Sequence, residues 1–318
     1  MRLAAIDCGT NTIRLLIGDY ELTDQGIIIN ELERAGEIVR LGVGVDRTGR
    51  LNEEAIERTL DFTRACAERF EHYGVQQARF VATSASRDAV NRDVFVNGVW
   101  AILGFEPEVI SGEEEAALAF LGSKVGSNVD MTHPRLVVDL GGGSTEFSLG
   151  TQYPDAYIST NMGSGRVTER FLSEGVTPAS EAAAREFVRS MLDTAAEQVD
   201  FSAAHSLVGL AGTITAVTAH ALGLEYFDSQ KIGGAQVPVE DMRRSCDAII
   251  HATPEQLEQW EFIAPGRRSV IAAGALICDE MVARVAADTA NTDHPVRHIN
   301  VSLHDILDGI AMAMVDQA

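Results

Sequence analysis

The sequence predicts an α/β protein built from two related lobes. An apolar run that ends in an aspartate, a turn rich in glycine and hydroxyl side chains, and a second apolar run occur together twice, at residues 2–17 and again at residues 135–149. Each copy is typical of a strand, a tight turn and a second strand. Because the copies lie about one domain apart, and because 318 residues make about two domains, a duplicated architecture is expected.

The rest of the first lobe alternates strands and helices. Asn52 is expected to cap an amphipathic helix that ends at Gly74, and a further helix is expected over 93–103, with Trp100 in the core. The predicted order is three strands, then helix, strand, helix, strand and helix. The extended segments after the first hairpin are those at 26–33, 79–83 and 108–110.

The second lobe begins in the same way and then contains more helix. We expect helices over 181–199, 239–251 and 269–286, and strands over 207–210 and 296–301. A final helix over 303–315 is expected to pack back on the first lobe. We place the boundary within 123–134, which gives domains of residues 1–125 and 126–318.

The composition excludes several classes of protein. With 47 acidic and 25 basic side chains, the formal net charge is −22, and such a surface repels nucleic acid and anionic membranes. The longest apolar run, 270–278, is too short to cross a bilayer, and Asp7 interrupts the apolar start that a signal peptide needs. No CxxC pair occurs, so we expect a cytoplasmic protein with reduced thiols; the four cysteines are Cys8, Cys66, Cys246 and Cys278.

The two glycine-rich turns are the strongest sign of function. Turns of this composition present backbone N–H groups and hydroxyls to an anion, and a carboxylate at the end of each preceding strand, Asp7 or Asp139, suits Mg²⁺. A plain hairpin turn is the alternative, which the duplication makes less favourable. The predicted phosphate-binding residues of the two turns are Gly9, Thr10, Asn11, Thr12, Gly141, Gly142, Gly143, Ser144 and Thr145.

The turns and four further segments resemble the exopolyphosphatase and guanosine pentaphosphate phosphohydrolase family, within the actin, sugar kinase and Hsp70 superfamily. The resemblance implies two ribonuclease H-like, actin-like ATPase lobes with an interlobe cleft, the second lobe carrying extra helices. It also implies Mg²⁺ or Mn²⁺ as cofactor and leads us to expect a homodimer. The segments, which follow the family's order, are 7–12, 82–87, 110–116, 139–146, 211–216 and 264–267.

The resemblance assigns the catalytic carboxylate to Glu115. The residues are compatible with this assignment, because the neighbouring glutamates have structural explanations. Ser111 and Glu114 have the spacing of a capping box, and the helix N-terminus favours Glu113. Glu115 comes after the cap, at the start of an entirely apolar stretch, where burial would raise its pKa and suit it as a general base. A solvated glutamate at the start of a helix is an equally good reading of the residues alone.

Several cations are candidates for phosphate binding. Arg87, expected at a strand end that faces the cleft, and Arg166 could each hold a phosphate bidentately. Lys231 and Arg267 are weaker candidates, and all of these could instead be surface ion-pair partners. The resemblance adds Gly212 and Thr213 to the phosphate site and Glu146 to the metal site, beside Asp7 and Asp139.

The function that follows is Mg²⁺-dependent hydrolysis of the terminal phosphoanhydride of inorganic polyphosphate, which releases orthophosphate. Short chains are expected to be preferred, because few cations are available to extend a binding track. Family members often carry Arg where this chain has Ala117, so one phosphate contact is missing. The alternatives are a guanosine pentaphosphate 5′-phosphohydrolase, a kinase of the superfamily and a non-catalytic sensor of phosphate chains.

Overall fold

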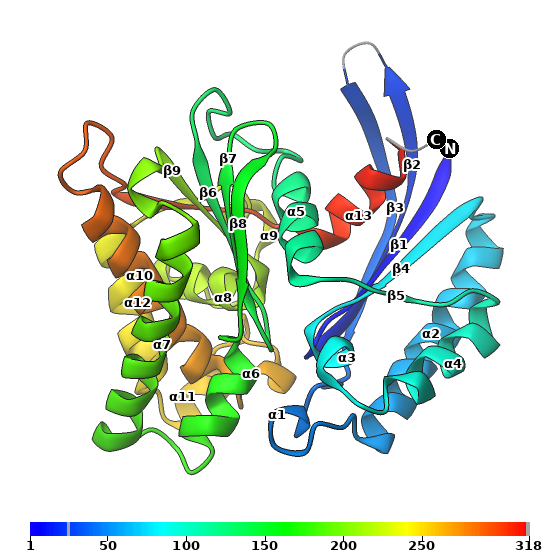
Figure 1. Cartoon of the computed structure of the whole chain (residues 1–318), viewed down its shortest axis with the longest axis horizontal. Helices are drawn as coiled ribbons and strands as arrows, with labels where there is room; N and C mark the ends of the chain where they lie inside the picture. Colours follow the sequence, from blue (N-terminus) through cyan, green and yellow to red (C-terminus); the bar gives the residue numbers. More distant parts are fainter. Residues whose placement is uncertain (24–25, 316–318) are drawn as a thin grey trace. The chain divides into compact units, whose positions relative to one another are not determined.

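The computed structural model describes residues 1–23 and 26–315 of the chain. It divides into two compact units (Figure 1). Unit 1 comprises Met1–Gly122 and Ile306–Ala318, and unit 2 comprises Ser123–Asp305. We expected domains of residues 1–125 and 126–318, with the last helix joining the first domain. The chain passes from unit 1 to unit 2 after Gly122 and returns after Asp305.

Unit 1 contains a five-stranded sheet in the order β3-β2-β1-β4-β5, which is the ribonuclease H-like arrangement. The first three strands form an antiparallel meander, and β4 and β5 extend the sheet on the other side of β1 in parallel. Apolar side chains cover both faces of β1, so this strand is buried from its second residue onward. The strands are β1 (Arg2–Cys8), β2 (Thr12–Thr23), β3 (Gly26–Ile38), β4 (Gln77–Ala82) and β5 (Glu108–Val109).

The helices of unit 1 begin and end largely where the sequence predicts. The Asn52 side chain accepts hydrogen bonds from two backbone N–H groups of α2, and Gly74 ends that helix in the left-handed conformation. The sequence predicts Trp100 in the core, but this residue is 56% exposed. Helix α4 buries a different face, which carries Phe95 and Val99. The helices are α1 (Val45–Thr48), α2 (Glu53–Tyr73), α3 (Ser84–Asp88), α4 (Arg92–Leu103), α5 (Gly112–Gly122) and α13 (Ile306–Val315).

The C-terminal helix α13 packs against α5 and β1 within unit 1, where Figure 1 shows α5 and α13 side by side. The two helices approach closely at Gly309, because a Cβ atom there would lie 1.9 Å from the carbonyl oxygen of Leu118. The Arg34 guanidinium fastens α13 to β3 by donating to both carboxylate oxygens of the buried Asp308, at 2.6 and 3.2 Å. These contacts hold α5 in place from a distant part of the chain.

Unit 2 contains a six-stranded sheet in the order β10-β11-β9-β6-β7-β8. Strands β6, β7 and β8 repeat the antiparallel meander of unit 1, and β9 and β11 run parallel to β6. The sequence does not predict strands β8 and β10, which have no continuous apolar run and lie at the two edges of the sheet. The strands are β6 (Arg135–Leu140), β7 (Thr145–Gly150), β8 (Pro154–Thr160), β9 (Ser206–Leu210), β10 (Gln236–Pro238) and β11 (His298–Val301).

Helix α12 is the centre of the helical layer of unit 2. It contacts α7, α8 and α10 and is buried over most of its surface, as its continuous apolar composition indicates. None of the helices in the described parts of the chain is long and apolar enough to cross a membrane. The helices are α6 (Ser164–Val167), α7 (Pro178–Gln198), α8 (Ala211–Ala221), α9 (Ser229–Ile232), α10 (Val239–Ile250), α11 (Pro254–Gln259) and α12 (Ile271–Thr289), with short 3₁₀ or π turns at 168–172, 201–203 and 265–267.

Candidate active site

The glycine-rich turn of unit 1 joins β1 to β2, and its backbone carbonyls fix its shape. The carbonyl oxygen of Thr12 accepts from the N–H of Gly9 at 2.9 Å, which closes the turn. The carbonyls of Thr10 and Asn11 accept from Gly42 and Arg40 at 2.8 and 2.9 Å. A Cβ atom on Gly42 would lie 2.3 Å from the Thr10 side chain, so the segment that contains Gly42 packs closely against the turn.

At the mouth of this turn, Asp7 lies directly opposite Arg14 in the antiparallel pair β1–β2. The Arg14 guanidinium donates to Asp7 Oδ2 through Nη2 at 2.6 Å and through Nε at 3.1 Å. Asp7 is buried, and the ion pair compensates its charge. The sequence reasoning missed Arg14, although the register of a hairpin closed around residues 9–12 puts it across from Asp7.

The turn of unit 2 joins β6 to β7 and is supported in a similar way. The Gly141 N–H donates to Ser144 O at 3.0 Å, and the start of α6 then binds the turn, with Gly165 N–H donating to Gly142 O at 2.8 Å. The Arg166 side chain joins this support, since its Nε donates to Gly143 O at 2.8 Å. Thr145 is fully buried and donates its hydroxyl hydrogen bond to the carbonyl of Met162.

Two buried acidic residues lie at paired positions of β6 and β7 beside the second turn. Asp139 lies directly opposite Glu146 in β6–β7, and the two residues are only 8% and 3% exposed. Directly opposed residues of an antiparallel pair have their Cβ atoms about 4.5–5.5 Å apart, and like charges at this spacing repel. The Ser159 hydroxyl on β8 donates to Glu146 Oε1 at 2.7 Å. The two carboxylates offer hard oxygen ligands that suit a divalent cation.

The carboxylates of Asp139 and Glu146 suit a magnesium ion that is also bound by water and phosphate oxygens. Mg²⁺ prefers hard oxygen ligands and commonly binds one or two carboxylates, with water and phosphate oxygens completing its shell. Asp139 and Glu146 supply two such carboxylates beside a turn of backbone N–H groups. The described residues contain no group of three or more His, Cys, Asp or Glu side chains arranged to hold a metal, so a closed all-protein cage is not present there.

Glu115 is a buried carboxyl group of unit 1 whose pKa is strongly perturbed. Ser111 caps α5, because its hydroxyl accepts from the Glu114 N–H at 3.2 Å, and the Glu114 carboxylate instead binds Arg79 at 2.8 Å. Glu115, one residue on, is 8% exposed. Burial raises its pKa to about 7, and the charge of Asp7 adds to this effect, whereas Arg87 and a hydrogen bond with Thr83 act in the opposite direction.

Arg87 lies on the one-turn helix α3 and not at a strand end, because β4 finishes at Ala82 and the chain turns into a helix at Ser84. Its Nη1 donates to Glu115 Oε2 at 3.2 Å and to the Ile110 carbonyl at 2.9 Å. On the same helix, the buried hydroxyls of Ser84 and Ser86 make no hydrogen bond to any described residue. Arginine, glutamate and these hydroxyls thus form one polar cluster in unit 1.

The segment after β9 forms a second tight turn in unit 2. Ala211 has φ +69°, a left-handed conformation that is rare for alanine, and Gly212 and Thr213 follow at the start of α8. Arg267 lies over this turn, with Nη1 3.1 Å from Gly212 O, and a Cβ atom on Gly212 would overlap the guanidinium at 2.1 Å. Lys231, on α9, is largely exposed and lies 3.6 Å from Asp228.

Each unit therefore brings together its own part of the predicted site. Unit 1 gathers Asp7, Arg87 and Glu115, and unit 2 gathers Asp139 and Glu146 beside the turn that Arg166 supports. The model of the Ppx/GppA phosphatase family matches residues 20–293. The chain belongs to this family. The resemblance seen in the motifs is thereby confirmed.

Relatives of the Ppx/GppA family match this chain over nearly its whole length. Exopolyphosphatase 2 of Mycobacterium tuberculosis is 42% identical over 320 residues, which cover 98% of each chain. The crystal structure of an exopolyphosphatase-like protein has a TM-score of 0.93 at 37% identity, covering 98% of this chain and 97% of the other. A Ppx/GppA family member of Aquifex aeolicus has a TM-score of 0.78 at 26% identity, covering 100% of this chain and 98% of that one.

Proposed function

We propose that the protein is an exopolyphosphatase, which hydrolyses the terminal phosphoanhydride of inorganic polyphosphate and releases orthophosphate. The identity of 42% with Exopolyphosphatase 2 of Mycobacterium tuberculosis, across nearly all of both chains, supports the substrate class. The observation that carries the chemistry is the burial of Glu115, which raises its carboxyl pKa to about 7 although the neighbouring Arg87 acts in the opposite direction. A group with this pKa exchanges protons readily at neutral pH.

Glu115 is the proposed general base. Its carboxylate accepts a proton from water while the water oxygen bonds to the terminal phosphorus and the bridging P–O bond breaks. The electron pair of that bond stays on the shortened chain, and the new phosphate leaves as orthophosphate. The guanidinium of Arg87, which donates to Glu115, is the proposed cation for the terminal phosphate, and it stabilises the negative charge that develops there.

The metal and phosphate roles are proposed for unit 2. Asp139 and Glu146 would hold Mg²⁺ or Mn²⁺, which neutralises phosphate oxygens when it is bound. The backbone N–H groups of the turn at 141–144 are suited to hold phosphate oxygens, since glycine permits close approach. Arg166, Arg267 and the turn at Gly212 and Thr213 are the proposed further phosphate contacts; in unit 1 the turn at 9–12 has the same proposed role.

We propose further that cuts are made one at a time and that short chains are preferred. Retaining a long polyanion through successive cuts needs a track of positive charge, and the chain has 25 basic against 47 acidic side chains. Sampling the digestion of a long polyphosphate on a gel tests this: a gradual shift to shorter lengths is expected. Full-length chains that persist beside orthophosphate alone would show processive action.

One comparison of substrates tests the function itself. Release of orthophosphate from polyphosphate, guanosine pentaphosphate and ATP is measured side by side with Mg²⁺ and again with EDTA. Polyphosphate is expected to be cleaved fastest, and only with the metal. Faster release from guanosine pentaphosphate would replace the proposal with the phosphohydrolase, a phosphorylated acceptor formed from ATP would indicate a kinase, and binding without hydrolysis would indicate a sensor.

A cytoplasmic location and a homodimer complete the proposal. All four cysteines are free, buried thiols, which suits a reducing compartment. Light scattering of the purified protein tests the oligomeric state, with twice the chain mass expected.

A further inference from the structure

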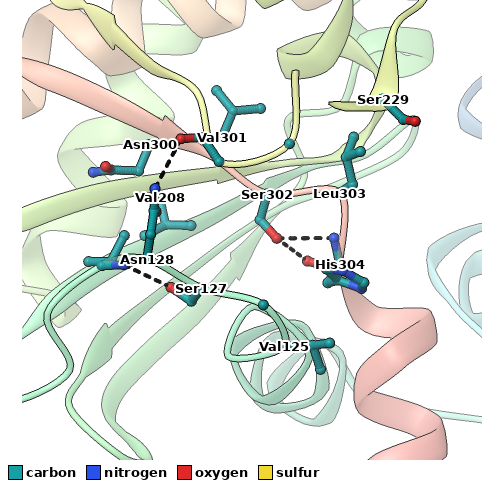
Figure 2. A pocket seen from close by; sticks show the side chains of 14 residues that line it. Val125, Ser127, Asn128, Val208, Ser229, Asn300, Val301, Ser302, Leu303 and His304 are labelled. Atoms are coloured by element: carbon teal, nitrogen blue, oxygen red, sulfur yellow. Dashed lines mark hydrogen bonds between the residues drawn. The ribbon is translucent and has the colours of Figure 1, made fainter. Parts of the chain in front are cut away.

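Several hydroxyl side chains of this protein stabilise the main chain near their own position. Along the wall of a cavity in unit 2, the Ser302 hydroxyl donates to the His304 carbonyl at 2.8 Å and accepts from the His304 N–H at 3.0 Å (Figure 2). In unit 1 the fully buried Thr59 donates its hydroxyl hydrogen bond to the carbonyl of Ala55, one turn earlier in α2, at 2.7 Å. Such bonds shape a loop or satisfy a helix carbonyl, and they explain a hydroxyl without any part in catalysis.

Thr83 is a buried threonine whose hydroxyl reaches a different helix. It occupies the N-cap position of α3, where a threonine side chain ordinarily accepts a hydrogen bond from an N–H group of the first turn. In the described structure of α3 this side chain makes no capping hydrogen bond. Its hydroxyl instead forms a hydrogen bond with the carboxylate of Glu115, which belongs to α5.

The main chain of Thr83 connects the other groups of the proposed site in unit 1. Its N–H donates to the carbonyl of Cys8, the residue after Asp7 on β1, at 3.1 Å. Its carbonyl accepts from the N–H of Arg87 at 3.0 Å. One residue therefore binds the strand that carries Asp7, the backbone of Arg87 and the carboxylate of Glu115.

The end of β4, directly before Thr83, is also bound to the segment that leads into α5. The carbonyl of Ala82 accepts from the N–H of Ile110 at 3.1 Å, and Ile110 immediately precedes Ser111, which caps α5. Thr83 itself is 3% exposed, so its hydrogen bond to Glu115 forms away from water, where such a bond is stronger. The donor and the carboxylate are thus held in place by the backbone on both sides.

We propose that Thr83 is a positioning residue, whose hydroxyl holds the Glu115 carboxylate in the orientation that accepts a proton from the attacking water. Because Glu115 is the base of the proposed function, this role of Thr83 rests on that proposal. A threonine suits the role, since its branched Cβ restricts the side chain to few rotamers. An uncharged donor also orients the carboxylate without neutralising the negative charge that a base needs.

The test compares two substitutions of Thr83 with polyphosphate as substrate. Thr83→Val removes the hydroxyl and keeps the branched shape, and kcat is expected to fall about tenfold to 100-fold with KM changed less than about twofold. Thr83→Ser keeps the hydroxyl and should retain at least about one third of the parental kcat. A packing role predicts the opposite order, because valine fills the space of threonine and serine leaves a small cavity.

Thr59→Val is the matched control. It makes the same chemical change at a fully buried threonine of unit 1, whose hydroxyl binds the main chain instead of Glu115. Its kcat should stay within about twofold of the parental value, although a buried hydrogen bond is lost in both valine variants. Thermal melting of both variants shows that a loss of stability does not account for a fall in kcat confined to Thr83→Val.

Glu115→Gln, measured beside these variants, separates the role of Thr83 from the proposed function. In the Glu115→Gln background, Thr83→Val is expected to change kcat less than about twofold, because the base it positions is already gone. The role of Thr83 alone is overturned if Glu115→Gln loses activity while Thr83→Val keeps the parental kcat, if Thr83→Ser is slower than Thr83→Val, or if the two effects add fully. Both proposals fail if Glu115→Gln keeps the parental kcat or if the parent protein does not hydrolyse polyphosphate.

Discussion

In both units the residue before the end of the first strand is an aspartate, which lies opposite a residue of the second strand beside a glycine-containing turn. In unit 1 the facing residue is Arg14, which forms an ion pair with Asp7. In unit 2 it is Glu146, so that Asp139 faces a second carboxylate. The backbone arrangement is the same and the charge at the facing position is reversed.

This difference indicates how a duplicated fold can be given two roles. The ion pair in unit 1 compensates Asp7, which is also a predicted metal ligand, and the charge of Asp7 raises the pKa of Glu115. The opposed carboxylates of unit 2 have the donor set for a divalent cation. We therefore assign the proposed proton transfer to unit 1 and the proposed metal binding to unit 2.

The largest effect is expected from Glu115→Gln, which keeps the shape of the proposed base and removes its proton affinity. Turnover should fall about 10²–10⁴-fold with substrate binding retained. In the parent enzyme, activity should decline as the pH falls through about 7, because protonated Glu115 cannot accept a proton. Glu113→Gln, on the exposed start of the same helix, is the control; equal rates for the two variants would refute the assignment.

Glu146→Arg gives the hairpin of unit 2 the charge pattern of unit 1. Turnover is expected to fall at least about 100-fold, and Mg²⁺ should no longer raise the melting temperature, because one carboxylate is replaced by a cation. The measurements are activity against Mg²⁺ concentration and thermal melting with and without the metal. Asp155→Asn, an exposed carboxylate on β8, is the control. An undiminished response to Mg²⁺ in Glu146→Arg would show that the metal does not bind at this hairpin.

Gly212→Ala tests whether Arg267 acts as a phosphate contact. The new Cβ atom would overlap the guanidinium, so the arginine must move, and KM for polyphosphate is expected to rise about tenfold with a smaller change in kcat. A double-mutant cycle with Arg267→Ala supplies the control: the two effects should not add if the glycine acts through the arginine. Fully additive effects would contradict this role.

Stability should respond to Glu115 in the opposite sense to activity. The folded protein raises the pKa of this carboxyl from 4.5 to about 7, so the folded state binds more protons than the unfolded state between these values. The contribution of Glu115 to the free energy of unfolding therefore falls as the pH rises from about 4.5 to 7. Glu115→Gln should be more stable than the parent by about 1–3 kcal/mol at pH 8, and by much less at pH 5. Denaturant unfolding at the two pH values measures this, and an equal difference at both would contradict it.

The smallest effect is expected from Asp7→Asn, which removes the charge of Asp7 while keeping its shape. The pKa of Glu115 should fall, because one of the groups that raise it is lost, and the acid limb of the pH–rate profile should move to lower pH by less than about one unit. Asp19→Asn, at the far end of the same hairpin, where Asp19 is half-buried and pairs with Arg2, should leave the profile in place. A shift to higher pH in Asp7→Asn would be inconsistent with the proposed coupling.

Much of the fold follows from local signals in the sequence. The two strand–turn–strand copies, the cap at Asn52 and the stop at Gly74 depend on neighbouring residues, and such signals are readable without the rest of the molecule. The edge strands β8 and β10 lack a strong apolar pattern, and the sheet they join defines them.

The residues of the candidate site also fall into those that local sequence signals reveal and those that the fold brings together. Its motifs, with Glu115 and the aspartates Asp7 and Asp139, stand out in the sequence because the turns and the start of α5 are short contiguous segments. The partners of these residues come from elsewhere in the fold: Ser159 reaches Glu146 from the next strand, and Arg87 reaches Glu115 from a helix 28 residues away.

The sequence alone therefore determined the kinds of residues, their order and the two turns, because these depend on interactions between near neighbours. Only the tertiary structure decided the charge environment of each carboxylate. Burial and the distance to other charges set a pKa, and both arise when separate segments pack together. For this reason Glu115 could be identified from its motif, whereas its pKa near 7 and the opposite character of the two hairpins required the folded protein.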